Sequence, residues 1–329
     1  MLLTPAPTRT EHTFAYAAGT VTASMFHPAT PGRHGAVVMV LGVGPLPLSG
    51  LADRFAEALA REGVVVLIPQ SSALLAERLL PEETDAFEQS VALLAGQDDV
   101  DPTRLGFIGL SAAGGLSVVA AARPALRDRV RFVNALGGYY DATQLLLDVA
   151  SRSIDVDGEV RPWEPEERTQ RVLAIALTET VADPSERALL DQAFVQHADV
   201  ADSAWDGASQ EAANVRALLV GGRDREATSS VIARLSPAAR ARLVAISPSS
   251  YLSDVHAHLY LMHDTGDQFI PFTQTRALVA AAPPGLVRRA TEFSIFEHVI
   301  PDRPVPWQTF VPDLWALYWH VQAVLLELL

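Results

Sequence analysis

Short, uninterrupted apolar runs constrain the fold of this chain more than any other feature of its sequence. Residues 36–41 (AVVMVL) and 64–68 (VVVLI) contain no polar side chain and are bounded by glycine or proline. A run of this kind fits a strand that is covered on both faces, as in a parallel sheet. Helical patterns separate the runs, and this alternation predicts an α/β fold with a doubly wound, mostly parallel sheet. Further strands are predicted at residues 105–108, 130–135, 258–262 and 292–296, and helices at 51–61, 82–95 and 116–122.

Two segments depart from this rhythm. Residues 12–26 alternate loosely and break at Ala18-Gly19, which predicts a β-hairpin that adds an antiparallel N-terminal edge to the sheet. Residues 141–250 carry helical patterns and no convincing strand. We therefore expect an α/β core made of residues 1–140 and 251–329, with a helical cap inserted at 141–250. Helices of the cap are predicted at residues 164–181, 184–197, 210–221 and 229–243.

The composition excludes several classes of function. With 329 residues, of which 49% are hydrophobic and 19% charged, the chain has the make-up of a globular protein. It contains no cysteine, which excludes disulfides, thiolate metal sites and a cysteine nucleophile. The net charge of −14 argues against nucleic-acid binding, which needs a basic surface. We find no signal peptide and no apolar run of the ~18 residues that a transmembrane segment needs, so we expect a cytoplasmic protein.

The sharpest local motif lies at residues 106–115 (GFIGLSAAGG), where a buried strand runs into a turn of small residues and then into a helix. A nucleophile elbow requires this context, because its turn is strained and its neighbours must be small. The motif places Ser111 above the strand end and at the N-terminus of a helix, whose dipole favours a developing oxyanion. A phosphate-binding loop is the competing reading, but its lysine is absent.

Two later strands deliver an acid and a histidine. Residues 259–271 (LYLMHDTGDQFIP) carry Asp267 in a polar turn, and residues 293–298 (FSIFEH) end in His298. Each of these residues follows a predicted strand, as Ser111 does. Parallel strands bring their carboxyl ends to one edge of the sheet, so we expect the three side chains to meet there.

These motifs resemble the α/β-hydrolase superfamily, and the nearest branch is that of bacterial esterases and dienelactone-hydrolase-like enzymes with a helical cap. The chain order Ser…Asp…His is that of the family's triad, and residues 263–271 resemble its acid-bearing turn, with Asp264 in place of the usual glycine. The resemblance covers roughly residues 30–140 and 245–300. It implies that Ser111 is the nucleophile, His298 the general base and Asp267 the acid that orients the histidine.

Two other acids and one other kind of site stay open. Asp264 lies in the same turn as Asp267, and Asp141 follows the fourth strand, where some members of the fold carry their acid. A metal site at His256, His258 and His263 deserves consideration because of their spacing, but we expect none, since no carboxylate joins them at ligand spacing. We also expect no cofactor.

The resemblance also implies an oxyanion hole and a substrate pocket. The expected backbone donors are the N–H groups of Val43 and Ala112, with Gly44 as the alternative to Val43. Glycines at 42 and 44 allow the chain to turn sharply toward the site. The side chains expected to line an apolar pocket are Leu46, Leu48, Tyr139, Tyr140 and Phe269.

The expected activity is hydrolysis of small or medium acyl esters through an acyl-enzyme, with a small-molecule ester as the partner. The alternatives are another acyl-transfer or C–C-bond hydrolase with the same triad, and a non-catalytic binding member of the fold. Residues 314–329 are expected to form a buried or interface helix. Residues 307–319, which overlap this helix, are rich in aromatic side chains. A homodimer interface and a membrane-surface contact are therefore alternatives to packing on the sheet.

Overall fold

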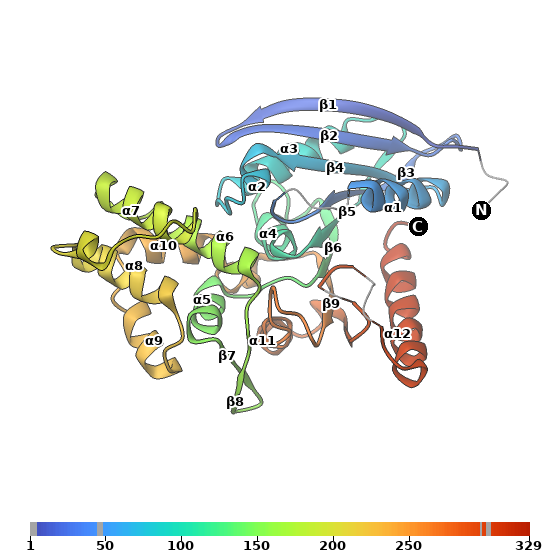
Figure 1. Ribbon diagram of the computed structural model, residues 1–329. Helices are drawn as coiled ribbons and strands as arrows, with labels where there is room; N and C mark the ends of the chain where they lie inside the picture. The colour runs from blue at the N-terminus through green and yellow to red at the C-terminus, as the bar shows by residue number, and fades with distance from the viewer. Residues whose placement is uncertain (1–4, 45–48, 297, 301–303) are drawn as a thin grey trace.

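A computed structural model describes residues 5–44, 49–296, 298–300 and 304–329 (Figure 1). Within them, an eight-stranded sheet has the order β1-β2-β4-β3-β5-β6-β9-β10. The strands from β4 to β10 run parallel, and β1 and β2 form the antiparallel N-terminal hairpin. The prediction of a doubly wound, mostly parallel sheet is confirmed. The strands are β1 Thr8–Tyr16, β2 Gly19–His27, β3 His34–Val40, β4 Val65–Ser71, β5 Val100–Leu110, β6 Val130–Leu136, β9 His258–Asp264 and β10 Val287–Phe293.

The strand order reverses between β3 and β5. From β3 the chain moves outward to β4, and it then returns to pair β5 against the other side of β3. Ligand sites of open α/β sheets form at such a reversal, beyond the carboxyl ends of the strands. The loop after β3 and the turn after β5 therefore border the expected site.

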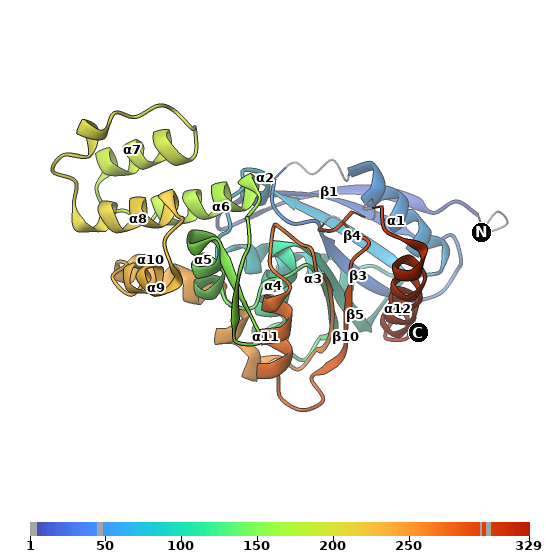
Figure 2. The same ribbon diagram turned by 60° about the horizontal axis from the view of Figure 1, so that its bottom comes forward.

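Helices cover both faces of the sheet. On one face, α1 Ser49–Arg61 and α12 Trp307–Leu325 pack on alternate strand residues such as Val37 and Met39. On the other, α3 Glu83–Ala95, α4 Ala112–Ala121 and α11 Thr273–Ala281 pack in the larger core, which includes Val38. Because both faces are buried, the central strands contain continuous apolar runs such as residues 36–40 of β3 and 65–68 of β4. Figures 1 and 2 show α12 at the end of the molecule opposite the mostly helical segment between β6 and β9, here named the inserted segment.

The inserted segment between β6 and β9 is mostly helical, but the prediction that it lacks strands is wrong. Strands β7 Ser153–Val156 and β8 Glu159–Pro162 form a hairpin. Its turn, Asp157-Gly158, has φ angles of 57° and 86°. Asp-Gly is a preferred sequence for such two-residue turns, so a local signal was present. The helices of the inserted segment are α5 Ala142–Ser151, α6 Glu167–Thr178, α7 Pro184–Phe194, α8 Gln210–Val220, α9 Arg225–Ile232 and α10 Pro237–Ile246, and its 3₁₀ turns are Asp202–Trp205, Pro248–Ser250 and Leu252–Asp254. Outside this segment, the short helix α2 Ser72–Leu75 follows β4.

Two predicted elements are misplaced. The single helix expected at 229–243 is two helices, because Ser236 caps a new one through the N–H of Ala239 at 3.2 Å and Pro237 begins it. The last strand lies at Val287–Phe293 instead of 292–296. This strand is at the sheet edge, and its alternate side chains are exposed or half-buried, so it lacks the continuous apolar run of the inner strands.

Helix α12 packs on the sheet through only three fully buried side chains, Leu317, His320 and Val324. His320 hydrogen-bonds to Asn134 of β6 and to Thr291 of β10, each at 2.9 Å. Among the described residues, no helix combines the length and apolarity required to cross a membrane.

Candidate active site

Ser111 lies in a strained turn between β5 and α4, with φ at 56° and ψ at −138°. Its N–H donates to the carbonyl of Leu136 at 2.8 Å, which fastens the turn to β6. A Cβ atom on Gly109 would lie 2.7 Å from Cα of Gly114, so the helix can pack this close only because both residues are glycine. The small residues of the motif thus allow the sharp turn that lifts Ser111 above the sheet.

Asp267 and His298 form a buried pair. His298 Nδ1 donates to Asp267 Oδ2 at 2.6 Å, and the other carboxylate oxygen accepts the N–H groups of Phe269 at 2.7 Å and Ile270 at 3.1 Å. Burial alone would raise the pKa of Asp267, but the interactions of its carboxylate with His298 and with His263 hold the pKa well below its ordinary value. The carboxylate is therefore charged and accepts a hydrogen bond from Nδ1–H. The proton of the neutral imidazole thus stays on Nδ1, and the lone pair of the ring lies on Nε2.

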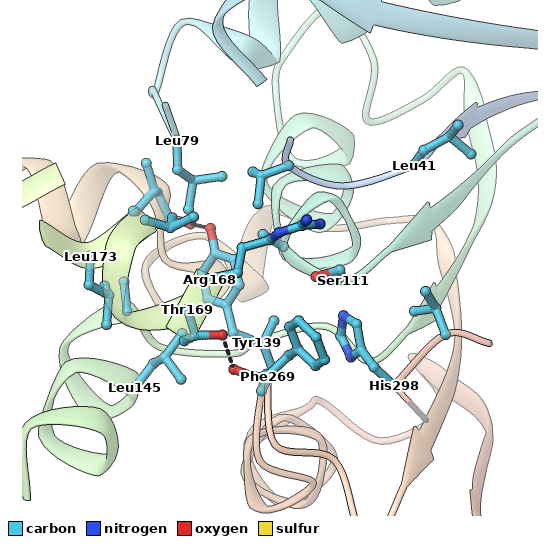
Figure 3. Close-up of a pocket in the computed structure, with 17 residues that line it drawn as sticks. Leu41, Leu79, Ser111, Tyr139, Leu145, Arg168, Thr169, Leu173, Phe269 and His298 are labelled. Atoms are coloured by element: carbon cyan, nitrogen blue, oxygen red, sulfur yellow. Dashed lines mark hydrogen bonds between the residues drawn. The ribbon is translucent and has the colours of Figure 1, made fainter. Parts of the chain in front are cut away.

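His298 Nε2 is buried and has no hydrogen-bond partner among the residues that the structure describes. Figure 3 shows the imidazole facing Ser111 across a cavity that both residues line. The ring of Phe269 stacks on the imidazole, with centroids 4.5 Å apart and planes at 19°. Asp267 thus holds one edge of the ring and Phe269 one face, and an unpaired acceptor remains beside Ser111.

The two other candidate acids, Asp264 and Asp141, accept hydrogen bonds from backbone N–H groups. Asp264 accepts the N–H groups of Gly266 at 2.7 Å and Phe296 at 2.8 Å. Asp141 caps α5, accepting two N–H groups of its first turn and the hydroxyl of Ser249 at 2.6 Å. Of the three acids that the sequence left open, Asp267 is the one hydrogen-bonded to His298 in the described structure.

The loop after β3 passes directly against Ser111. Gly42 has φ at 98°, and a Cβ atom there would lie 3.1 Å from Cβ of Ser111. Val43 and Ala112 line the same cavity as Ser111. The N–H of the alternative donor, Gly44, already donates to the carbonyl of Leu74 in α2 at 2.7 Å, which favours Val43.

The cavity beside Ser111 is narrow and apolar, with a volume of ≈ 60 Å³, room for several water molecules. Tyr139 and Phe269 lie on its wall. Tyr140 is not among the described residues that line it, because its chain turns toward Gln274, which accepts its N–H at 3.1 Å. Leu46 and Leu48 lie outside the described residues. The remaining wall is formed by Leu41, Val43, Leu79, Ala112, Ala142, Leu145, Arg168, Thr169, Val172, Leu173, Ile246, Ile270 and Val299.

The three histidines of the considered metal site lie with different partners. His256 pairs with Asp128 at 2.8 Å, and His258 with Glu327 at 2.7 Å. His263 is fully buried and bonds to the hydroxyl of Thr275. Within the described parts of the chain, no cluster of three or more histidine or acidic side chains could hold a metal ion.

Comparisons with known proteins agree with this architecture. The 2,6-dihydroxy-pseudo-oxynicotine hydrolase is 15% identical with a TM-score of 0.56, over 96% of this chain and 67% of that one. A hypothetical protein of Pseudomonas aeruginosa is 19% identical with a TM-score of 0.50, over 96% and 94%. The chain has the α/β-hydrolase fold. The acylaminoacyl peptidase of Pyrococcus horikoshii is 12% identical with a TM-score of 0.52, over 90% of this chain but 38% of the peptidase. No protein-family model and no curated protein sequence matches.

Sequence reasoning missed a glycine that packs against the His–Asp pair of this α/β-hydrolase fold. Gly137 follows β6 with φ at 63°. A Cβ atom there would lie 3.1 Å from Cε1 of His298 and 3.3 Å from Oδ2 of Asp267. The Gly137-Gly138 pair after a strand was the available signal, and its close approach to two distant residues became visible only in three dimensions.

Sequence reasoning also missed the contacts between the inserted segment and the acid turn. Three donors, two just before α6 and one in its first turn, bind three successive carbonyl oxygens of the acid turn. The pairs are Trp163 Nε1 with Asp267, the N–H of Glu166 with Gln268, and Thr169 Oγ1 with Phe269, each at 2.9 Å. The segment therefore stabilises the turn from which Asp267 and Phe269 reach His298.

Proposed function

We propose that the protein is a serine hydrolase of carboxylic esters, with Ser111 as nucleophile, His298 as general base and Asp267 as the orienting acid. The observation that carries this proposal is the buried Nε2 of His298, which has no partner in the described structure and faces the cavity beside Ser111. A buried unpaired acceptor destabilises a fold, and a catalytic role explains why such an atom is retained. Hydrogen bonds between base and nucleophile are often long before substrate binds and shorten in the complex.

In the proposed reaction, Ser111 Oγ attacks the ester carbonyl carbon while its proton passes to His298 Nε2. The carbonyl electron pair moves to oxygen, where the N–H groups of Val43 and Ala112 stabilise it. Collapse of this intermediate expels the alcohol, which takes the proton from His298, and leaves an acyl-serine. Water then attacks with His298 again as base, which releases the acid and restores Ser111. Asp267 stabilises the imidazolium in both steps.

The cavity supports a small or medium acyl chain as substrate. Its wall is almost entirely apolar, and helices of the inserted segment supply much of it through Leu145, Val172 and Leu173. We propose that residues 141–250 act as a cap over a core formed by residues 1–140 and 251–329. A cap that narrows the site disfavours polymers and large acyl groups.

Other reactions share this machinery. One of the similar structures is an acylaminoacyl peptidase, so amide hydrolysis is an alternative. C–C-bond hydrolysis by the same three residues is another. Rates on p-nitrophenyl acetate, butyrate, octanoate and laurate, against the matching p-nitroanilides, separate ester from amide hydrolysis. We expect the esters to be faster, with a preference for acetate and butyrate.

Labelling with a fluorophosphonate probe tests the nucleophile directly. We expect the wild-type protein and the Ser229→Ala control, which removes an exposed hydroxyl of α9, to be labelled. Ser111→Ala should abolish labelling while the thermal unfolding temperature is kept. A folded wild-type protein that takes no label would contradict the proposal and favour a non-catalytic binding role.

A further inference from the structure

Among the described residues that line the mostly apolar cavity, one is an arginine, Arg168 of α6. Figure 3 shows its guanidinium group on the same side of the cavity as Ser111, while the next residue, Thr169, turns to the carbonyl of Phe269. The Arg168 side chain is 35% exposed, so its guanidinium group reaches both solvent and the cavity. The position of Arg168 therefore bears on which substrates fit.

The ionic partner of Arg168 in the described structure is Glu77, and this pair is loose. Arg168 Nε lies 3.7 Å from Glu77 Oε1, whereas Arg171 Nε approaches the other oxygen of Glu77 at 2.9 Å. A single carboxylate is thus shared by two guanidinium groups, and the nearer one belongs to Arg171. Positive charge remains at the cavity, although the chain as a whole carries −14.

We propose that Arg168 binds a carboxylate group of the substrate, so that the preferred esters are anionic. This inference rests on the proposed ester hydrolysis at Ser111 and names its substrate class. A guanidinium group matches a carboxylate with two parallel hydrogen bonds, and the apolar surroundings strengthen them. The monoester of a short dicarboxylic acid satisfies both the apolar wall and the cation.

Binding to protein that carries Ser111→Ala tests the anion site without requiring turnover. By calorimetry, we expect monoethyl succinate to bind and its uncharged analogue ethyl pentanoate to bind at least tenfold more weakly. Arg168→Gln added to this protein should remove the difference, and Arg161→Gln, an exposed arginine of β8 that pairs with Glu159, should keep it. Equal affinity for the two esters before substitution overturns the inference.

Kinetics on the active protein give the second readout. The ratio of kcat/KM for monoethyl succinate over ethyl pentanoate should fall at least tenfold in Arg168→Gln, mainly through KM, and recover in part in Arg168→Lys. Equal losses for both esters indicate a merely structural role and overturn the inference. Failure of the proposed function is distinguishable, because it appears as absent fluorophosphonate labelling whatever the calorimetry shows.

A different observation concerns the outer side of α12. Its large apolar side chains are strongly exposed, up to 72% for Trp307 and 62% for Trp315. The acidic residue of the helix, Asp313, binds the N–H and hydroxyl of Ser294, and its histidine, His320, is buried. This uncharged surface, here named the α12 face, consists of Trp307, Phe310, Val311, Leu314, Trp315, Tyr318, Trp319 and Val321.

The α12 face has the size and composition of a protein interface. Trp315, Tyr318 and Trp319 pack on one another with ring centroids 5.4 to 5.7 Å apart, which holds them in place before any partner arrives. Aromatic residues are enriched at interfaces, and charged residues are depleted from interface cores. Eight exposed large side chains present an area on the order of 800 Å², about one partner's share of a standard interface and more than monomers usually expose.

We infer that the α12 face pairs with the same face of a second copy of this chain. Two uncharged helices can meet about a two-fold axis without placing like charges together. A membrane surface is a poorer partner, because the chain contains no lysine, carries −14 and would be repelled by anionic lipids.

Light scattering coupled to size-exclusion chromatography tests this pairing on the full chain. We expect a dimer for the wild type, a monomer for Trp315→Glu, and a dimer for the control Val160→Glu, which changes an exposed residue of β8. A monomeric wild type at micromolar concentration overturns the inference. So does co-sedimentation of the wild type, but not Trp315→Glu, with phosphatidylcholine–phosphatidylserine vesicles.

Discussion

The indole Nε1 of Trp163 donates to the carbonyl oxygen of Asp267 at 2.9 Å, so the inserted segment is bonded to the residue whose carboxylate orients His298. The segment therefore does more than cover the cavity. Any change that frees this bond alters the position of the acid while leaving Ser111 in its turn.

Trp163→Phe should lower kcat about fivefold to tenfold with little change in KM, because a hydrogen bond of this kind contributes about 1 kcal/mol. The phenyl ring keeps an apolar aromatic side chain at this position and removes the Nε1–H donor. Trp205→Phe, also in the inserted segment but outside the described cavity wall, is the matched control. Equal kinetics for the two variants would show that the contact with Asp267 has no effect on the acid.

Asp267→Asn should reduce kcat by roughly four orders of magnitude while the protein stays folded, because an amide can donate to Nδ1 and so favour the wrong imidazole tautomer. Proton NMR should show loss of the downfield Nδ1 resonance of His298. Asp141→Asn is the control, since an asparagine oxygen can still cap α5. Activity retained in Asp267→Asn would exclude this residue as the acid.

Gly137→Ala should lower both activity and stability, for separable reasons. Its positive φ strains any L side chain by about 1 kcal/mol, and the added methyl group also meets His298 at 3.1 Å. Gly285→Ala has the same backbone penalty, with φ at 84°, but nothing within 4 Å of the added atom. Urea unfolding should show similar losses for both variants, whereas only Gly137→Ala should lose most of its kcat.

The strands that build the sheet were predictable because their physical cause is local. A strand segment buried on both faces must be apolar at every position, and residues 36–40 of β3 and 65–68 of β4 are. The small residues around Ser111 are likewise demanded by the turn itself. Edge strand β10 has no such demand, and its position was therefore misjudged.

The remaining errors come from partners that are distant in sequence. Its position after β3 makes Gly44 a reasonable oxyanion donor in the sequence, but its N–H is bonded to the carbonyl of Leu74 in α2. Nothing near Trp163 in the sequence indicates that its indole binds the acid turn, and nothing near Arg168 indicates that it faces Ser111. Short helices leave only a weak hydrophobic period in the sequence, and contacts between loops leave none, so only the folded chain reveals them.

His320 should make the stability of the protein depend on pH. Burial, reinforced by Arg289, lowers the pKa of His320 to about 4, from an ordinary value of about 6.5. Between these two values the unfolded chain binds a proton at this residue and the folded chain does not. The free energy of unfolding therefore falls as pH decreases through that window, by up to about 3 kcal/mol for this group.

Urea unfolding at pH 7 and pH 5 measures this effect. Because other groups also titrate, the informative quantity is the difference in free energy between the two pH values, compared across variants. We expect His320→Gln, which keeps polar atoms near Asn134 and Thr291, to be less stable at pH 7 but to lose about 2 kcal/mol less than the wild type on acidification. His197→Gln, at an exposed histidine, should behave as the wild type. An unchanged pH dependence in His320→Gln would mean that this histidine is not held neutral between α12 and the sheet.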